Sequence, residues 1–148
     1  MAIGPRRRAR IVALQALFEA DNSDHDPMDS LQRIIESQRT GKAPAAFAAE
    51  LVEAVMAKQE DLDRRIAKVA PAWPVEQLSA VDRNILRLAI SEMLGDNGTP
   101  VRAAINEAVE LAKAFGSEKS SSFVNGVLGS IAKELEQQPA DQPTAKRG

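Results

Sequence analysis

The stretch that decides the fold is AVDRNILRLAISEML, residues 80–94. Its apolar side chains recur at helical spacing and cover most of the helix circumference. They are Val81, Ile85, Leu86, Leu88, Ala89 and Met93. A helix that is apolar on so much of its surface is stable only when other elements surround it. We therefore expect residues 80–94 to form the central helix of the molecule.

The sequence on either side of this helix predicts further helices and no strand. The predicted helices before it are Pro5–Ala20, Met28–Gln38, Pro44–Val69 and a short turn near Glu76. After it, Thr99 and Pro100 supply an N-cap and a first-turn proline for a helix that ends at Phe115. Ser117 is the predicted cap of a last helix, which continues to about residue 136. The fold class is all-α, with about seven helices.

Composition limits the core and the chemistry. Aromatic residues make up 3% of the chain, with no Tyr and one Trp, so the core should be aliphatic and rich in Ala. The absence of Cys excludes disulfides, zinc–thiolate sites and cysteine nucleophiles. No apolar run is long enough to span a bilayer, and no signal peptide is evident, so a cytoplasmic location is expected. Residues 138–148 are rich in Pro and Gln and should form a disordered tail.

Motifs for catalysis, metal or cofactors are not evident. His25 lies among acidic residues in a loop, but the spacing lacks the glycine and distal glutamate of a calcium loop, and one histidine is a poor zinc ligand set. No glycine-rich phosphate loop or nucleophile elbow appears. Asn106 and Glu107 could serve a small hydrolase or transferase, yet no nucleophile accompanies them. The sequence predicts a protein that is not an enzyme and has no cofactor or metal.

Positive charge is concentrated at one place. Arg6, Arg7, Arg8 and Arg10 fall at the start of the first predicted helix, although the net charge of the chain is −2. The helix dipole disfavours cations at that end, so the cluster indicates an anionic partner, with phosphate as the first candidate. We expect the first helical turn to project beyond the core. An acidic protein surface is the alternative partner, and the chain would then be a helical protein-interaction module.

Three segments carry a family resemblance: RRRARIVALQALFEAD (residues 6–21), VDRNILRLAISEML (81–94) and TPVRAAINEAVELAKAFGSEKSSSFVNGVLGSI (99–131). In order and spacing they resemble the NusB family of bacterial transcription antitermination factors. The resemblance implies two packed helical subdomains, at about 5–70 and 74–136 within a domain of residues 1–137. It implies binding to the boxA element of ribosomal RNA leader transcripts together with NusE, a ribosomal small-subunit protein. Other Nus factors and RNA polymerase are further implied partners, and no membrane is involved.

The resemblance also implies site residues. The implied RNA-binding residues are Arg6, Arg7, Arg8, Arg10, Gln15 and Lys119, and the implied partner-binding residues are Phe18, Glu76, Asp82 and Phe123. Phe18 stands where many relatives carry Tyr, so a hydroxyl contact is lost. Lys119 stands where some relatives carry an acidic residue. The sequence leaves open the RNA consensus and whether the free protein is a monomer or a homodimer.

Overall fold

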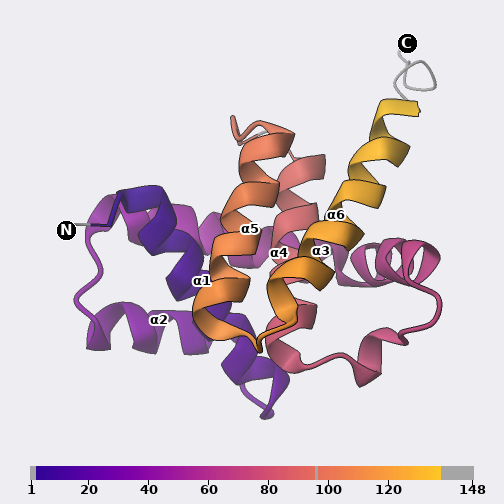
Figure 1. Cartoon of the computed structure of the whole chain (residues 1–148). Coiled ribbons are helices and arrows are strands. Elements are labelled where there is room, and N and C mark those ends of the chain that lie inside the picture. Colours follow the sequence, from indigo (N-terminus) through magenta and orange to yellow (C-terminus); the bar gives the residue numbers. More distant parts are fainter. Residues whose placement is uncertain (1–2, 96, 138–148) are drawn as a thin grey trace.

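The computed structural model describes residues 3–95 and 97–137, which form six α-helices, one short 3₁₀ helix and no strand (Figure 1). The helices are α1 (Pro5–Asp21), α2 (Pro27–Ser37), α3 (Lys42–Val69), η1 (Val75–Gln77), α4 (Ala80–Leu94), α5 (Val101–Phe115) and α6 (Ser120–Gln137). The predicted all-α fold is confirmed. The predicted tail, 138–148, lies outside the described residues. Within the described ranges, no helix is both long and apolar enough to cross a membrane.

Local chemistry sets most helix starts. The Asp26 carboxylate accepts a hydrogen bond from the N–H of Met28 (2.7 Å) and caps α2, whose first residue is a proline. Ser79 caps α4 in the same way, since its hydroxyl accepts from the N–H of Asp82 (3.1 Å). These starts lie within a residue of the predicted ones.

The two last helices begin later than predicted. Pro100 precedes the first residue of α5 and no side chain caps this helix, so the prediction of Thr99 as its N-cap is wrong. The helix α6 begins at Ser120, whose hydroxyl accepts from the N–H of the predicted cap, Ser117 (2.9 Å). Gly116 makes this turn possible, because a Cβ there would lie 2.5 Å from the Cβ of Ser120. The α5–α6 connection is therefore a tight turn closed by Ser120, and Ser117 does not act as the N-cap of α6.

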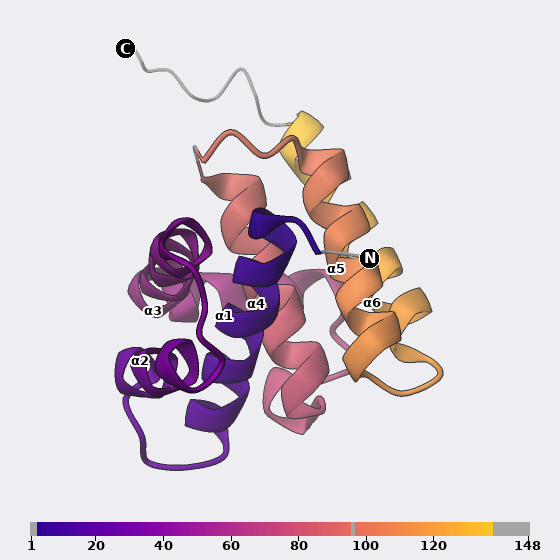
Figure 2. The same ribbon diagram turned by 90° about the vertical axis from the view of Figure 1, so that its left-hand side faces the viewer.

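The helix α4 is the centre of the molecule, as predicted. Every residue from 84 to 93 is buried, and α4 contacts α1, α3, α5 and α6. Figure 2 shows α2 and α3 on one side, α1 and α4 in the middle, and α5 and α6 on the other side. One hydrophobic core draws on all six α-helices. Its fully buried members within the described residues are aliphatic, with many alanines, and the partly buried Phe47 and Phe123 lie against it.

Ion pairs fix the helices relative to one another. Arg87 of α4 makes a two-pronged contact with Asp63 of α3 (2.8 and 2.9 Å). Arg83 and Asn84 both reach Asp21 at the end of α1, at 2.7 and 3.0 Å. Paired guanidinium–carboxylate contacts are strongly directional, so they fix α1 and α3 in register with α4.

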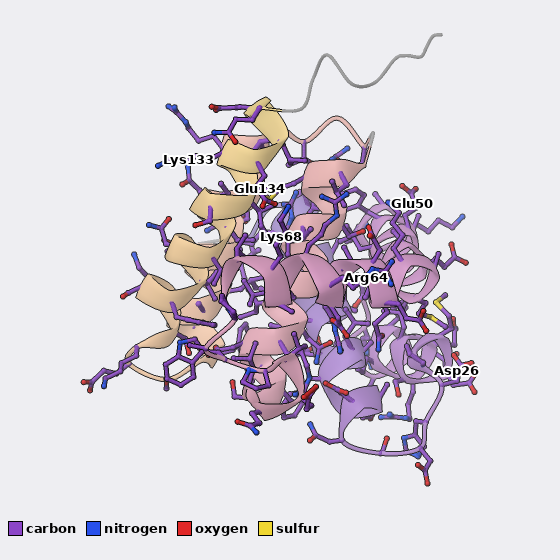
Figure 3. The ribbon with its side chains drawn as sticks, turned by 90° about the vertical axis from the view of Figure 1, so that its right-hand side faces the viewer. Asp26, Glu50, Arg64, Lys68, Lys133 and Glu134 are labelled. Carbon is purple, nitrogen blue, oxygen red and sulfur yellow. The ribbon has the colours of Figure 1, made fainter. Side chains whose placement is uncertain are left out.

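A further ion pair lies on the surface shown in Figure 3. There Lys68 of α3 lies beside Glu134 of α6, with the charged atoms 3.3 Å apart. Because both side chains are partly in solvent, this pair contributes little to stability, on the order of 0 to 1 kcal/mol.

Candidate nucleic-acid interface

The arginine cluster lies at an open groove between the first turn of α1 and the start of α5. The first turn holds no acidic residue, and its N-cap, Gly4, offers no side chain to the free N–H groups. The groove has a volume of about 440 Å³ and is lined by residues 4–7 and 98–100, with Arg10, Ala103 and Glu107. Figure 2 shows the N-terminal turn of α1 in front of the core and next to α5. The groove is therefore open to a ligand, with basic side chains along one wall.

Arg6 is exposed but held in place by neutral groups. Its guanidinium lies over the ring of Phe47 of α3, 4.3 Å from the ring centroid. It also donates to the carbonyl of Asn97 (3.2 Å) and to the hydroxyl of Thr99 (3.4 Å). A cation over an aromatic face is stabilised without losing its charge. Arg6 is thus oriented while its positive charge stays available to a ligand.

Arg10 does not project into solvent, so the expectation for the first turn is wrong at this residue. It is 5% exposed, and its Nε and Nη2 atoms each donate to the carboxylate of Glu92 at 2.8 Å. These hydrogen bonds raise the pKa of Arg10 above its ordinary value, although burial opposes the shift. Glu92 in turn accepts from Asn97 (3.2 Å), which also accepts from the N–H of Thr99 (3.0 Å). The buried pair thereby supports the loop that forms one wall of the groove.

Arg7 is half-exposed and engages Glu107 of α5 through two parallel hydrogen bonds. Nε lies 3.0 Å from Oε1, and Nη2 lies 2.8 Å from Oε2. The hydrogen bond from Arg7 lowers the pKa of Glu107 below its usual value, against the effect of burial. The same contact raises the pKa of Arg7. Both groups are fully charged near neutral pH, and the pair ties α1 to α5.

The remaining implied RNA-binding residues do not join this cluster. Arg8 is half-buried, and Gln15 accepts a hydrogen bond from Gln38 of α2 (2.9 Å). Lys119 is exposed just before α6, beyond the far end of α5. The groove lies at the start of α5, and at 1.5 Å per residue its 15 residues separate Lys119 from the groove by roughly 22 Å. A single RNA strand that contacts both the groove and Lys119 must therefore follow the whole length of α5.

A second surface lies beside α6, at the segment that follows α3. The rings of Trp73 and Phe123 meet edge to face, with centroids 6.4 Å apart and an interplanar angle of 76°. Trp73 is 59% exposed, and the two rings border a groove of about 390 Å³ between residues 69–73 and α6. A large exposed apolar side chain is typical of a protein contact site. Trp73 therefore shares one exposed surface with Phe123.

The other implied partner-binding residues lie around the start of α4. Phe18 is 41% exposed near the end of α1, and Glu76 is exposed in η1. Arg83 joins these elements, because it pairs with Asp21 and donates to the carbonyl of Val75 (3.2 Å). Asp82 has one buried carboxylate oxygen, Oδ1, without a hydrogen-bond partner among the described residues.

Sequence reasoning missed the residues that hold the arginines. Phe47, Glu92, Thr99 and Glu107 come from three helices and a loop, and no local pattern marks them. The sequence alone indicates an acid or base role for Glu107 and a cap role for Thr99. The only sequence signal is the local concentration of arginine at residues 6–10, which needs acidic partners from other parts of the chain. For the acidic loop near His25, no group of three or more His, Cys, Asp or Glu in the described ranges is placed to hold a metal ion.

The comparisons with known proteins agree with one another. The NusB family model matches residues 7–133. The transcription antitermination protein NusB of Dehalococcoides mccartyi (strain ATCC BAA-2266 / KCTC 15142 / 195) is 48% identical over 130 residues, which cover 88% of this chain and 91% of that protein. The solved structure of NusB from T. maritima is 36% identical, with a TM-score of 0.83, covering 90% of this chain and 94% of that one.

A crystal structure of the antitermination factors NusB and NusE in complex with dsRNA is also similar. The match has a TM-score of 0.80 and 28% sequence identity, and it covers 88% of this chain and 97% of the chain in that complex. Sequence, family model and fold thus point to one group of proteins over most of the chain. The chain belongs to the NusB family.

Proposed function

We propose that this protein is a transcription antitermination adaptor that binds boxA RNA of ribosomal RNA leader transcripts together with a NusE-type protein. With other Nus factors it would help RNA polymerase avoid premature termination, in the cytoplasm and without catalysis of its own. The observation that carries the proposal is the open groove lined by Arg6 and Arg7, whose guanidinium groups are positioned by three other parts of the fold. A relative solved with NusE and RNA supports the same two partners.

The proposed division of labour follows from the chemistry of the two surfaces. Arginines on phosphates position a strand but carry no base information. Sequence-specific reading of single-stranded RNA uses stacking and base-edge hydrogen bonds, and this chain has no Tyr and a single Trp. That Trp lies at the second surface, away from the groove. Selection of boxA would therefore depend on the partner protein as well.

The test is the salt dependence of binding to a single-stranded boxA RNA oligonucleotide. If about four phosphates are neutralised, log K should fall against log salt with a slope near −3. Replacing Arg6 and Arg7 by Ala should weaken binding and flatten the slope by about 1.4, since each phosphate contributes about 0.7 on a single strand. Arg10 is kept, because its replacement would disturb the core.

The matched control removes two positive charges elsewhere. Figure 3 places Arg64 and Lys133 on the side turned away from the view in Figure 2, and both are exposed. The variant Arg64→Ala/Lys133→Ala has the same net charge as the groove variant Arg6→Ala/Arg7→Ala. It should nevertheless retain the wild-type salt slope. Equal RNA binding by the folded groove variant and the wild type would overturn the proposal. Binding to an acidic protein, with no RNA binding, would favour the interaction-module alternative.

A further inference from the structure

One of the two exposed arginines of the groove, Arg7, is already engaged by a carboxylate. Arg7 presents Nε and Nη2 to Glu107 at 3.0 and 2.8 Å, which is the paired geometry that guanidinium also uses to bind phosphate. A phosphate cannot use this edge of Arg7 while Glu107 holds it. The side chain of Arg7 is 49% exposed and that of Glu107 is 23% exposed, so solvent and a ligand can reach the pair.

The other arginines of the groove differ from Arg7 in this respect. The pair of Arg10 and Glu92 is buried, with side chains 6% and 3% exposed, and belongs to the core. Arg6 is held by a ring, a carbonyl and a hydroxyl, none of which carries a charge. Arg7 is therefore the residue of the described groove at which an incoming phosphate meets direct competition from a carboxylate.

Glu107 also has a second cation within reach. Its Oε1 lies 3.9 Å from Nη1 of Arg10, so the carboxylate keeps a positive neighbour when Arg7 turns away. The Glu107 carboxylate therefore keeps Arg10 as a positively charged neighbour after Arg7 leaves it. An exposed ion pair is weak, and phosphate on RNA is a competitor of similar geometry, so the exchange is energetically accessible.

We propose that Glu107 is an acidic competitor built into the RNA site, which holds Arg7 in the free protein and must be displaced before an RNA phosphate can bind there. Glu107 thereby lowers the affinity for any polyanion and reserves Arg7 for a strand that is held by other contacts as well. This inference rests on the proposed RNA-binding function.

The test compares Glu107→Gln with Glu110→Gln on the same boxA RNA oligonucleotide. Glutamine at 107 would place an NH₂ group against one of the Arg7 N–H groups and so break the paired contact. Glu110 lies one turn further along α5 and contacts Lys113 (3.4 Å) instead, so its variant controls for the loss of one negative charge. We expect Glu107→Gln to bind RNA about two- to fivefold more tightly, with a salt slope steeper by up to about 0.7, and Glu110→Gln to change little.

A double-mutant cycle separates competition at Arg7 from a general charge effect. In the Arg7→Ala background, Glu107→Gln should give no more gain than Glu110→Gln. Equal gains from the two glutamine variants, or weaker RNA binding by a folded Glu107→Gln, would overturn the inference while leaving RNA binding itself established. Failure of the wild-type protein to bind RNA would overturn the proposed function, and this inference with it.

A direct measurement on the wild-type protein does not depend on a variant. In ¹⁵N-labelled protein, the Nε–H resonance of Arg7 should shift on saturation with the RNA, because its acceptor changes from carboxylate to phosphate. The Nε–H resonance of Arg10 should stay in place, since Glu92 remains its partner. An unchanged Arg7 resonance in the saturated complex would contradict the displacement of Glu107.

Discussion

At the scale of single residues, the arginines at the start of α1 have different tasks. Arg10 lies inside the molecule against Glu92, whereas Arg7, one turn earlier, meets Glu107 at the rim of an open groove. Charge pattern alone predicted an anionic ligand for the whole cluster. It could not separate these tasks, because Glu92 and Glu107 are 82 and 100 residues distant in the sequence from their partners.

The buried pair should matter most for stability. Arg10→Ala leaves the Glu92 carboxylate buried without its partner, so we expect the free energy of unfolding to fall by about 3–5 kcal/mol. Arg7→Ala removes an exposed pair and should cost no more than about 1 kcal/mol. Urea denaturation of both variants measures the difference.

A double variant controls for the burial of charge. Arg10→Met/Glu92→Leu removes both charges and keeps much of the side-chain volume, so it should be more stable than Arg10→Ala alone. Similar losses for Arg10→Ala and Arg7→Ala would mean that the contact with Glu92 does not stabilise the fold.

At the scale of elements, proline and capping residues made most helix bounds predictable. The starts of α1, α2 and α4 follow from such local signals. The start of α5 did not, because the Thr99 hydroxyl lies 3.4 Å from guanidinium nitrogens of both Arg6 and Arg10 instead of capping a helix. A local signal thus lost to contacts that only the folded molecule provides.

The end of α2 offers a test of backbone strain. Arg39 has a φ of 53° within a helix-ending turn, in which the N–H of Thr40 donates to the carbonyl of Ile35 (3.0 Å). Glycine adopts this left-handed conformation without steric cost, and it is the usual residue at this position. We expect Arg39→Gly to raise the free energy of unfolding by about 0.5–1 kcal/mol, measured by urea denaturation.

Arg39→Ala is the matched control for the lost side chain. Alanine removes the same charge but keeps the Cβ that disfavours positive φ, so it should not stabilise the protein. Equal stability of the glycine and alanine variants would show that the backbone at residue 39 is not strained.

At the scale of the whole molecule, the two candidate surfaces are separate: one lies between the starts of α1 and α5, and the other lies between residues 69–73 and α6. The sequence predicted the central place of α4, since its apolar residues surround the helix. It could not predict that α5 brings Glu107 to Arg7, because the polar face of α5 has no sequence pattern that indicates which helix it contacts. Trp73 was also unpredicted as a surface residue, since its flanking prolines signalled only the end of a helix.

If the partner protein contacts the same RNA as the arginine groove, binding of the protein and binding of the RNA should be coupled. We expect a NusE-type protein to tighten boxA binding at least about fivefold, and the RNA to tighten the protein pair by the same factor, as linkage requires. Phe123→Ala should weaken the protein pair and, through it, the RNA affinity of the mixture. Titrations of labelled RNA with each protein and with both measure the factor.

Met56→Ala provides the control for this coupling. Met56 is an exposed apolar residue (40%) on α3, away from the Trp73–Phe123 groove, and its loss should leave the factor unchanged. The coupling would be contradicted if each protein bound the RNA in the mixture with the same affinity that it has alone.

The exposed indole of Trp73 has an optical consequence. Because the chain has no Tyr and no second Trp, its intrinsic fluorescence at long excitation wavelengths arises from this one side chain. Emission of a solvated indole moves to shorter wavelength when the ring is covered, so the spectrum of the unlabelled protein reports events beside Phe123. The arginine groove contains no such fluorophore. Occupancy of one surface is thus visible in the emission of the native chain, while a dye on the RNA follows the other in the same cuvette.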